Sequence, residues 1–240
     1  MPDHVGPRHS GPRHIGIAAC SAEGAALCYR TICVEGAALF GPHDHPEVSM
    51  HTYSLARYMQ AIQSSDDWAG VADLLVASGE KLSRAGADFL ICPDNTVHRV
   101  MTRIRERSQL PWLHIAECVA EEAKARGYLR IGLTGTKYLL ESDVYPAEYL
   151  RPSPEEREKM NAIIFEELVY GRFESQSRRF FQEVIGRMQK AGCDAVALCC
   201  TEIPLLIRPE DSPLPTLDST RLLARAALKK AAETSASIHH

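Results

Sequence analysis

A twelve-residue pattern occurs twice in the chain, and it constrains the fold more than any other feature of the sequence. The copies run over residues 85–96 and 191–202, 106 residues apart. Each begins with Ala-Gly-x-Asp, continues as a short apolar run and ends in polar residues. This order is typical of a helix end, a capping glycine, a buried strand and a turn.

The repeat places Asp94 and Cys200 at equivalent positions, each just beyond the carboxyl end of a predicted strand. In open α/β sheets, ligands bind at that end of the strands. Both halves also open alike, because residues 14–19 and 130–136 each contain an apolar strand with a glycine. Strands that alternate with helices imply parallel sheets. The sequence therefore predicts an internal duplication with a site built from two facing halves.

The remaining segments predict the course of the chain between these strands. A second strand is expected near residues 47–53 and another at 111–115. Helices are expected at 25–35, 68–85, 97–107, 116–126, 155–170, 175–190 and 218–232. The last helix is predicted to pack back on the first half. The first subdomain then comprises residues 1–112 plus 218–240, and the second comprises residues 113–217.

Composition narrows the classes of partner and the cellular location. The net charge is −4, with both signs interspersed. Because the basic residues form no continuous stripe, no nucleic-acid partner is expected. No apolar run reaches the roughly 18 residues of a spanning helix, so no membrane is expected. The eight cysteines form no CxxC and lie largely in apolar runs, which favours free thiols and a cytoplasmic location. The polar first fourteen residues lack the apolar core of a signal peptide and predict a disordered lead-in.

Motifs for cofactors are absent from the sequence. It shows no GxGxxG, no P-loop and no pyridoxal lysine motif. The run His43-Asp44-His45 is interpreted as a solvated turn rather than a metal site. The sequence therefore predicts neither a cofactor nor a metal.

Three further stretches resemble one family. Residues 200–206, Cys-Thr-Glu-Ile-Pro-Leu-Leu, resemble the second catalytic motif of the aspartate/glutamate racemase superfamily, the cofactor-independent amino-acid racemases. Residues 95–98, Asn-Thr-Val-His, resemble its first motif, and Gly135-Thr136 with Glu141 and Tyr145 resemble another signature. The resemblance implies two α/β subdomains related by a pseudo-twofold, each a parallel sheet flanked by helices, with the active site in the cleft. It also implies a homodimer.

The family's chemistry uses two cysteines that face each other across the α-carbon of the substrate. Cys200 matches the second cysteine, whereas Asp94 stands where the first is expected. A free thiol has a pKa of about 8.5 and a free aspartate one of about 3.9, so an unperturbed Asp94 would be the weaker base. Burial raises a carboxyl pKa by up to about 3–5 units. At Cys200, backbone N–H groups of the turn are expected to lower the thiol pKa.

The resemblance also implies roles for the residues around these two. Hydroxyl and amide groups are expected to bind the α-carboxylate and ammonium, namely those of Asn95, Thr96, Thr136 and Thr201. Glu202 and His98 are expected to orient the catalytic groups, although a structural role at a helix start is equally open for His98. A side-chain carboxylate on the substrate needs a cation, for which Arg57 and Arg172 are the candidates.

The predicted function is cofactor-independent racemisation of an acidic amino acid, aspartate or glutamate, by proton abstraction and return from opposite faces. Two alternatives stay open. One is a decarboxylase or lyase that acts on a substituted dicarboxylate with Cys200 alone. The other is a non-catalytic amino-acid-binding protein.

Overall fold

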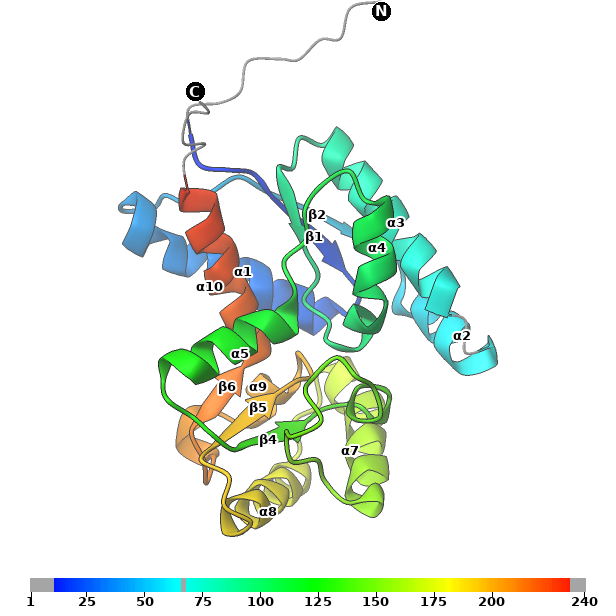
Figure 1. Cartoon of the computed structure of the whole chain (residues 1–240), viewed down its shortest axis with the longest axis vertical. Coiled ribbons are helices and arrows are strands. Elements are labelled where there is room, and N and C mark those ends of the chain that lie inside the picture. Colours follow the sequence, from blue (N-terminus) through cyan, green and yellow to red (C-terminus); the bar gives the residue numbers. More distant parts are fainter. Residues whose placement is uncertain (1–10, 66–67, 234–240) are drawn as a thin grey trace, which may run out of the picture.

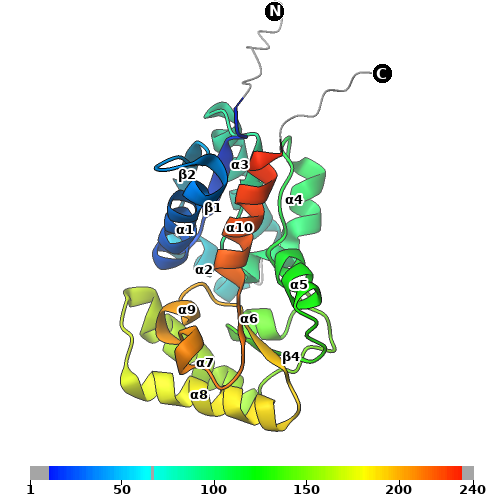
Figure 2. The ribbon, with the colours of Figure 1, turned by 90° about the vertical axis from the view of Figure 1, so that its left-hand side faces the viewer.

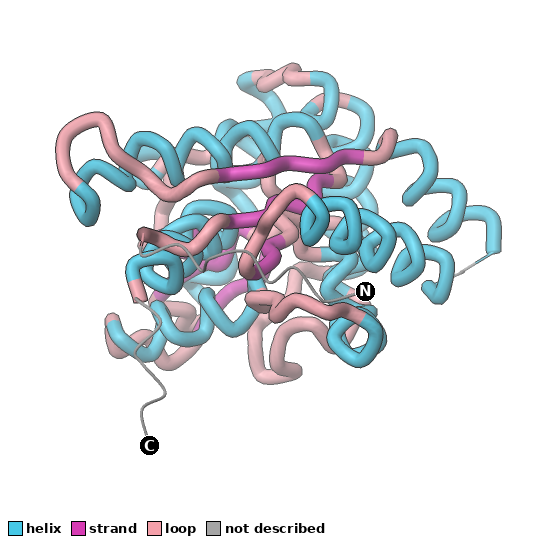
Figure 3. The backbone as a smooth tube through the Cα atoms, turned by 90° about the horizontal axis from the view of Figure 1, so that it is seen from above, coloured by secondary structure: helices cyan, strands magenta, loops and turns pink. Residues whose placement is uncertain are grey.

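The computed structural model describes residues 11–65 and 68–233, which form two parallel three-stranded sheets with the orders β2-β1-β3 and β4-β5-β6. Figure 1 shows one sheet in each half of the molecule. Seen from above, helices lie on both sides of the strands (Figure 3). The α/β architecture with two parallel sheets is therefore as the sequence predicts.

The first half alternates strands with helices, and two helices separate its second strand from its third. Its elements are β1 (Ile15–Ala19), α1 (Ala22–Phe40), β2 (Val48–Thr52), α2 (Leu55–Ser65), α3 (Trp68–Arg84), β3 (Phe89–Ile91), the 3-10 helix Thr96–Val100, α4 (Met101–Arg107) and α5 (Ile115–Ala125).

The second half repeats the alternation of strands and helices with shorter helices at its turns. Its elements are β4 (Ile131–Thr134), α6 (Lys137–Leu140), α7 (Pro154–Glu166), the 3-10 helix Leu168–Tyr170, α8 (Ser175–Lys190), β5 (Ala195–Leu198), α9 (Ile203–Leu206), the 3-10 helix Pro209–Asp211, β6 (Thr216–Asp218) and α10 (Ser219–Ala232). Among the described residues, no helix combines the length and the apolarity needed to cross a membrane.

The repeated aspartate fastens each copy of the pattern to the strand beside it. Asp88 accepts a hydrogen bond from the backbone N–H of His14, just before β1, at 2.7 Å. Asp194 accepts bonds from the N–H groups of Leu129 and Arg130, just before β4, at 2.8 and 3.1 Å. In each half, the aspartate side chain thus holds the backbone just before the first strand of the sheet by hydrogen bonds.

Strand register confirms that the two halves are built alike. In the first sheet Ile15 lies opposite Phe89, and in the second Ile131 lies opposite Ala195. Phe89 and Ala195 occupy the same position of the repeated pattern. The carboxyl ends of β3 and β5 consequently occupy equivalent places in their sheets.

Helix α10 and its neighbours join the halves. It follows β6 of the second sheet directly, yet it packs against α1 and α5. Figure 2 shows these three helices side by side. A salt bridge between Arg225 of α10 and Glu35 of α1 adds an N–O contact of 2.7 Å. A single apolar cluster, which includes Ile17 of β1 and Leu133 of β4, runs through both halves.

The structure departs from the sequence predictions in several segments. Residues 11–14, assigned to the disordered lead-in, are part of the fold, since His14 is buried and bonded to Asp88; residues 1–10 lie outside the described part. The strand predicted at 111–115 reduces to one bridge, between Trp112 and Leu90 of β3. Strand β6, Thr216–Asp218, lies in a segment with Pro209, Pro213 and Pro215 for which the sequence predicts no strand. The helix predicted at 155–170 ends at Glu166 and continues only as a 3-10 turn.

Candidate active site

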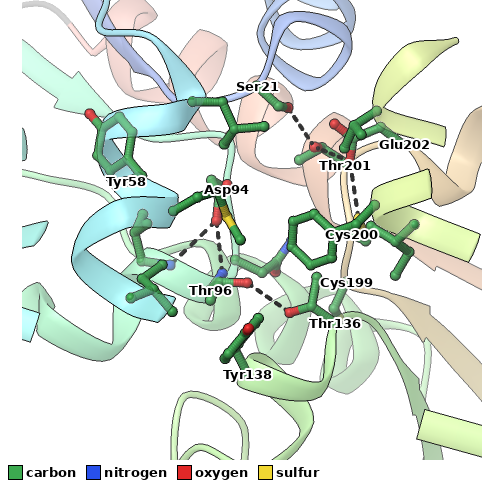
Figure 4. Close-up of a pocket in the computed structure, with 18 residues that line it drawn as sticks. Ser21, Tyr58, Asp94, Thr96, Thr136, Tyr138, Cys199, Cys200, Thr201 and Glu202 are labelled. Atoms are coloured by element: carbon green, nitrogen blue, oxygen red, sulfur yellow. Dashed lines mark hydrogen bonds between the residues drawn. The ribbon is translucent and has the colours of Figure 1, made fainter. Parts of the chain in front are cut away.

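A cavity of about 50 Å³ lies between the two halves and receives side chains from both. One water needs about 10–15 Å³ on this measure, so the space corresponds to a few waters. The turns after β3 and β5 supply residues 94–97 and 199–202, and α2, α6 and α7 supply most of the remaining lining. Figure 4 shows Asp94 and Cys200 in this lining, carried by different parts of the chain.

Asp94 lies in the turn between β3 and the following 3-10 helix. Its Oδ1 atom accepts hydrogen bonds from the backbone N–H groups of Thr96, at 3.0 Å, and Val97, at 3.3 Å. Burial, and then the negative charge of Glu202, raise the pKa of the carboxyl group to about 6, although the two N–H groups act in the opposite direction. At neutral pH Asp94 is therefore a carboxylate, and a stronger base than an exposed aspartate.

Cys200 lies in the corresponding turn after β5 and is buried. Its thiol donates a hydrogen bond to Oε2 of Glu202 at 3.0 Å. Burial first, and then the Glu202 charge, raise the pKa of the thiol well above its usual range. The backbone N–H of Glu202 acts to lower this pKa, as expected, but desolvation and the neighbouring carboxylate outweigh it, so the net shift is upward. Cys200 is a protonated thiol at neutral pH.

Glu202 is a buried carboxylate whose two oxygens differ in their number of hydrogen bonds. Oε2 accepts bonds from the Cys200 thiol and from the hydroxyl of Thr201, each at 3.0 Å. Oε1 has no hydrogen-bond partner. Glu202 thus holds the two preceding side chains in place and keeps one oxygen free.

Hydroxyl groups connect the halves across the cavity. Thr96 Oγ1 lies 3.0 Å from Thr136 Oγ1, and Ser21 Oγ lies 3.3 Å from Thr201 Oγ1. Because Thr201 donates its proton to Glu202, Ser21 must donate to Thr201. Each pair combines one residue of the first half with one of the second, so the cavity is formed by both halves together.

Comparison with known proteins identifies the family. A sequence model of the family described as Asp/Glu/Hydantoin racemase matches residues 31–227, most of the chain. The chain belongs to this family. As a member of it, the chain is an isomerase of the amino-acid racemase type.

Solved structures share the fold over nearly their whole length. A protein from Yersinia pestis, named as a candidate Asp/Glu racemase, is 31% identical with a TM-score of 0.81, over 91% of this chain and 99% of that one. An aspartate racemase homologue from Pyrococcus horikoshii is 27% identical with a TM-score of 0.77, over 92% and 100% of the two chains. Aspartate racemase from Picrophilus torridus, 17% identical, has the same fold with a TM-score of 0.72 over 91% and 94%.

Asn95, expected to bind the substrate, and His98, expected to orient a catalytic group or to have a structural role, both form hydrogen bonds within the protein. Asn95 lines the cavity, but its Oδ1 accepts from the Tyr145 hydroxyl at 2.7 Å and its Nδ2 donates to Ser219 at 2.9 Å. The His98 ring lies 3.0 Å from the carbonyl oxygen of Cys92 through Nε2, and its Nδ1 accepts from a backbone N–H at 3.4 Å. Burial, and then the nearby His114, lower the pKa of His98 to about 3, so the ring is neutral.

The two arginines expected to bind a substrate carboxylate lie outside the cavity lining. The Arg57 guanidinium stacks on the ring of Tyr53, 4.4 Å from its centroid. Arg172 donates to the carbonyl oxygen of Glu166. Thr96, Thr136, Thr201 and Glu202, in contrast, all line the cavity.

Sequence reasoning missed the apolar wall of the cavity. Leu55, Tyr58, Met59 and Ile62 of α2 form one part of it, and α7 and the turn after it form another. Their spacing in the sequence, positions 55, 58, 59 and 62, is the signal of an amphipathic helix that could have revealed α2. Ser21 was also missed as a lining residue, although it lies in the turn of small residues after β1, where the backbone can approach a ligand closely.

Metal ligands do not gather in the described part of the chain. Within residues 11–65 and 68–233, no three His, Cys, Asp or Glu side chains are grouped so that they could hold a metal ion. The side chains around the cavity instead offer carboxylate, thiol and hydroxyl groups, which are suited to proton transfer and hydrogen bonding.

Proposed function

We propose that the protein racemises an α-amino acid without a cofactor, with Asp94 and Cys200 as the two acid/base groups. The observation that carries this proposal is their placement at equivalent strand ends of two similar halves, in one cavity. Inversion at a carbon needs one proton acceptor and one proton donor on opposite faces. Two halves related by duplication supply such a pair.

The resting protonation states assign the direction of proton transfer. Asp94, a carboxylate above about pH 6, takes the α-proton from one face. Cys200, a thiol at neutral pH, gives its proton to the other face of the carbanion. The reaction leaves a protonated Asp94 and a Cys200 thiolate, which is the state required for the reverse direction. Before it donates, the thiol must rotate away from Glu202.

The α-carboxylate gains negative charge when the α-proton leaves, so it needs hydrogen-bond donors. The hydroxyls of Thr96 and Thr136 lie 3.0 Å apart in the cavity lining and have one free proton between them. The Thr201 hydroxyl donates to Glu202 in this structure and becomes a further donor when it turns to the substrate. We assign binding of the α-carboxylate to these groups. Asn95 holds the turn that carries Thr96, because its own side chain is already bonded on both sides.

The narrower prediction of aspartate or glutamate as substrate comes from the family resemblance. It requires the guanidinium of Arg57 or Arg172 to leave its present contact and enter the cavity. A homodimer and a cytoplasmic location likewise stay predictions. Light scattering of the purified chain measures the first, and fractionation of the source cells measures the second.

Exchange of the α-proton in D₂O, followed by NMR together with chiral chromatography, tests the proposal. Asp94→Asn and Cys200→Ala are each expected to abolish formation of the opposite enantiomer. Cys33→Ser, a change of a thiol on α1 outside the cavity lining, is the matched control and should keep full activity.

The same variants separate the alternatives. The contact between Cys200 and Glu202 gives one thiol its own carboxylate, which is the arrangement that a one-base enzyme would need. If Asp94→Asn protein still exchanged the α-proton and the amino acid kept its configuration, the result would support a one-base enzyme. Unchanged activity of both variants would contradict any role of this pair in catalysis.

A further inference from the structure

Carboxylates provide all the formal charge on the side chains that line the cavity. Asp94 and Glu202 both line it, and none of the described residues in the lining is Lys, Arg or His. The Glu202 charge already acts on Asp94, since it raises the pKa of that carboxyl group. A substrate side chain that carried a third carboxylate would therefore be repelled and poorly hydrated.

The basic groups nearest in the sequence to the lining are engaged elsewhere. Arg57 precedes the lining residue Tyr58, but its guanidinium lies on the Tyr53 ring. Lys137 follows Thr136, but its ammonium lies 3.2 Å from Glu158 in a salt bridge. The lining that the structure describes thus offers no cation to a side-chain carboxylate.

One oxygen in the site lacks a donor. Glu202 is 2% exposed, and its Oε1 atom has no hydrogen-bond partner, whereas Oε2 has two. A buried carboxylate oxygen without a donor is unfavourable, and a charged N–H group is the donor that stabilises it most. Every α-amino acid brings such a group as its ammonium.

Apolar side chains form one wall of the cavity. Leu55, Met59 and Ile62 of α2 face the cavity together with Ile164 and Phe165 of α7. Such a wall gains free energy when it buries a hydrocarbon side chain and loses it when it buries a charged one. The small volume of the cavity limits that side chain to medium size.

We propose that the site selects α-amino acids with an uncharged, aliphatic side chain of medium size, such as valine, leucine or methionine. Their ammonium binds Oε1 of Glu202, and their side chain packs against the wall formed by α2 and α7. This inference rests on the proposed racemase function and replaces the acidic substrate by a neutral one.

Rates of α-proton exchange for matched amino acids test the charge preference. We expect L-leucine or L-methionine to exceed L-glutamate by at least about tenfold in kcat/KM, since loss of a charge partner is worth that much. L-glutamine, similar in size to L-glutamate, should also exceed it. Faster exchange of L-glutamate or L-aspartate would overturn the proposal and leave the racemase function intact.

Variants of the wall provide a second test. Met59→Lys places a cation in the lining and should shift the ratio of rates towards L-glutamate, whereas Met59→Leu should preserve the preference for neutral substrates. An unchanged ratio in a folded Met59→Lys protein would contradict the assignment of the wall to the substrate side chain.

Binding measured without turnover separates this inference from the proposed function. In Cys200→Ala protein, calorimetry should show tighter binding of L-methionine than of L-glutamate or of 4-(methylthio)butanoate, which lacks the ammonium. When Glu202→Gln is added to the Cys200→Ala protein, the affinity for L-methionine should fall and the affinity for 4-(methylthio)butanoate should stay unchanged. Equal binding of the two methylthio compounds would overturn the role of Glu202. If L-methionine bound most tightly, but the wild-type protein exchanged the α-proton of no amino acid, only the racemase function would be overturned.

Discussion

At the scale of single residues, the acid/base pair of this protein is chemically unequal. Asp94 has a pKa of about 6, whereas the pKa of Cys200 is raised well above its usual range. The active form carries one proton, on the thiol, and it is populated between these two values. The equilibrium constant of racemisation is one, so kcat/KM must be the same for both enantiomers at every pH. The inequality of the pair can therefore appear only in kcat and KM separately.

The pH profile is the first prediction at this scale. We expect kcat/KM to fall below about pH 6, because Asp94 becomes protonated and can no longer accept the α-proton. In Asp94→Cys the acid limb should move to about pH 8.5 or above, since a buried thiol loses its proton only there. The profile of α-proton exchange, measured for both proteins and both enantiomers, gives the limb directly. An acid limb that stays in place in Asp94→Cys would assign it to a group other than Asp94.

The same carboxylate should lower the stability of the fold at neutral pH. Its pKa is about 6 in the folded protein and about 3.9 in an unfolded chain. Between these values the folded state keeps a proton that the unfolded state has released. The raised pKa thus stabilises the fold fully below about pH 4, and this stabilisation is lost as the pH rises through about 6.

Asp94→Asn tests this linkage, because the amide oxygen can still accept the two backbone bonds and carries no charge. We expect the variant to gain up to about 3 kcal/mol in unfolding free energy at about pH 7.5, and almost nothing at about pH 4. Partial access of water to the site makes the true gain smaller than this limit. Urea unfolding at the two pH values measures it. Equal changes at both would show that the charge does not strain the fold.

At the scale of secondary-structure elements, the start of α1 approaches the turn after β5 very closely. A Cβ atom on Gly24 would lie 2.2 Å from Oγ1 of Thr201 and 2.4 Å from its Cβ. Gly24 also donates its N–H to Ser21, the cap of α1, at 3.4 Å. A side chain at this position would therefore displace Thr201 and, with it, the Glu202 carboxylate.

Gly24→Ala is expected to lower kcat/KM by at least about tenfold through this displacement. Gly186→Ala is the control within a helix, because a Cβ there meets nothing within 4 Å. That variant should keep full activity and gain up to about 1 kcal/mol in stability, since alanine favours a helix over glycine. Both rates come from α-proton exchange, and both stabilities from thermal unfolding. Full activity of Gly24→Ala would show that the approach of α1 does not position Thr201.

Sequence predicts those elements whose signal is local. The two copies of the pattern fix β3 and β5, and thereby place Asp94 and Cys200 at equivalent ends. Strand β6, in contrast, has only three residues, directly follows Pro215 and exists because it pairs with β5. His14 likewise belongs to the fold through Asp88, which is distant in sequence. The apolar wall depends on how α2 and α7 pack across the two halves, which no local pattern reveals.

At the scale of the whole molecule, a buried chain of hydrogen bonds ties the halves together beside the site. The Tyr145 hydroxyl donates to Asn95, Asn95 donates to Ser219 at 2.9 Å, and Ser219 donates to the carbonyl oxygen of Leu198 at 2.8 Å. These residues belong to the turn after β3, to the start of α10, to the end of β5 and to the loop after α6. Because the cavity is assembled from the same turns, its geometry should depend on the docking of the two halves.

Cooperative unfolding of the whole chain follows from this linkage. Ser219→Ala leaves Nδ2 of Asn95 and the carbonyl oxygen of Leu198 without their partner, which should cost about 1–3 kcal/mol. Thr220→Val is the adjacent control, because the buried Thr220 hydroxyl has no hydrogen-bond partner and its removal should cost little. Both tryptophans, Trp68 and Trp112, lie in the first half, so their fluorescence reports that half while circular dichroism reports all helices.

In the wild-type protein the two signals should therefore change together in urea, and in Ser219→Ala both should shift to lower urea by the same amount. The joint shift is the decisive feature, since Ser219 contacts residues of both halves. If fluorescence and dichroism separated in the wild-type protein, the halves would unfold independently. If Ser219→Ala shifted only one signal, the hydrogen-bond chain would stabilise one half rather than the junction at which Asp94 and Cys200 meet.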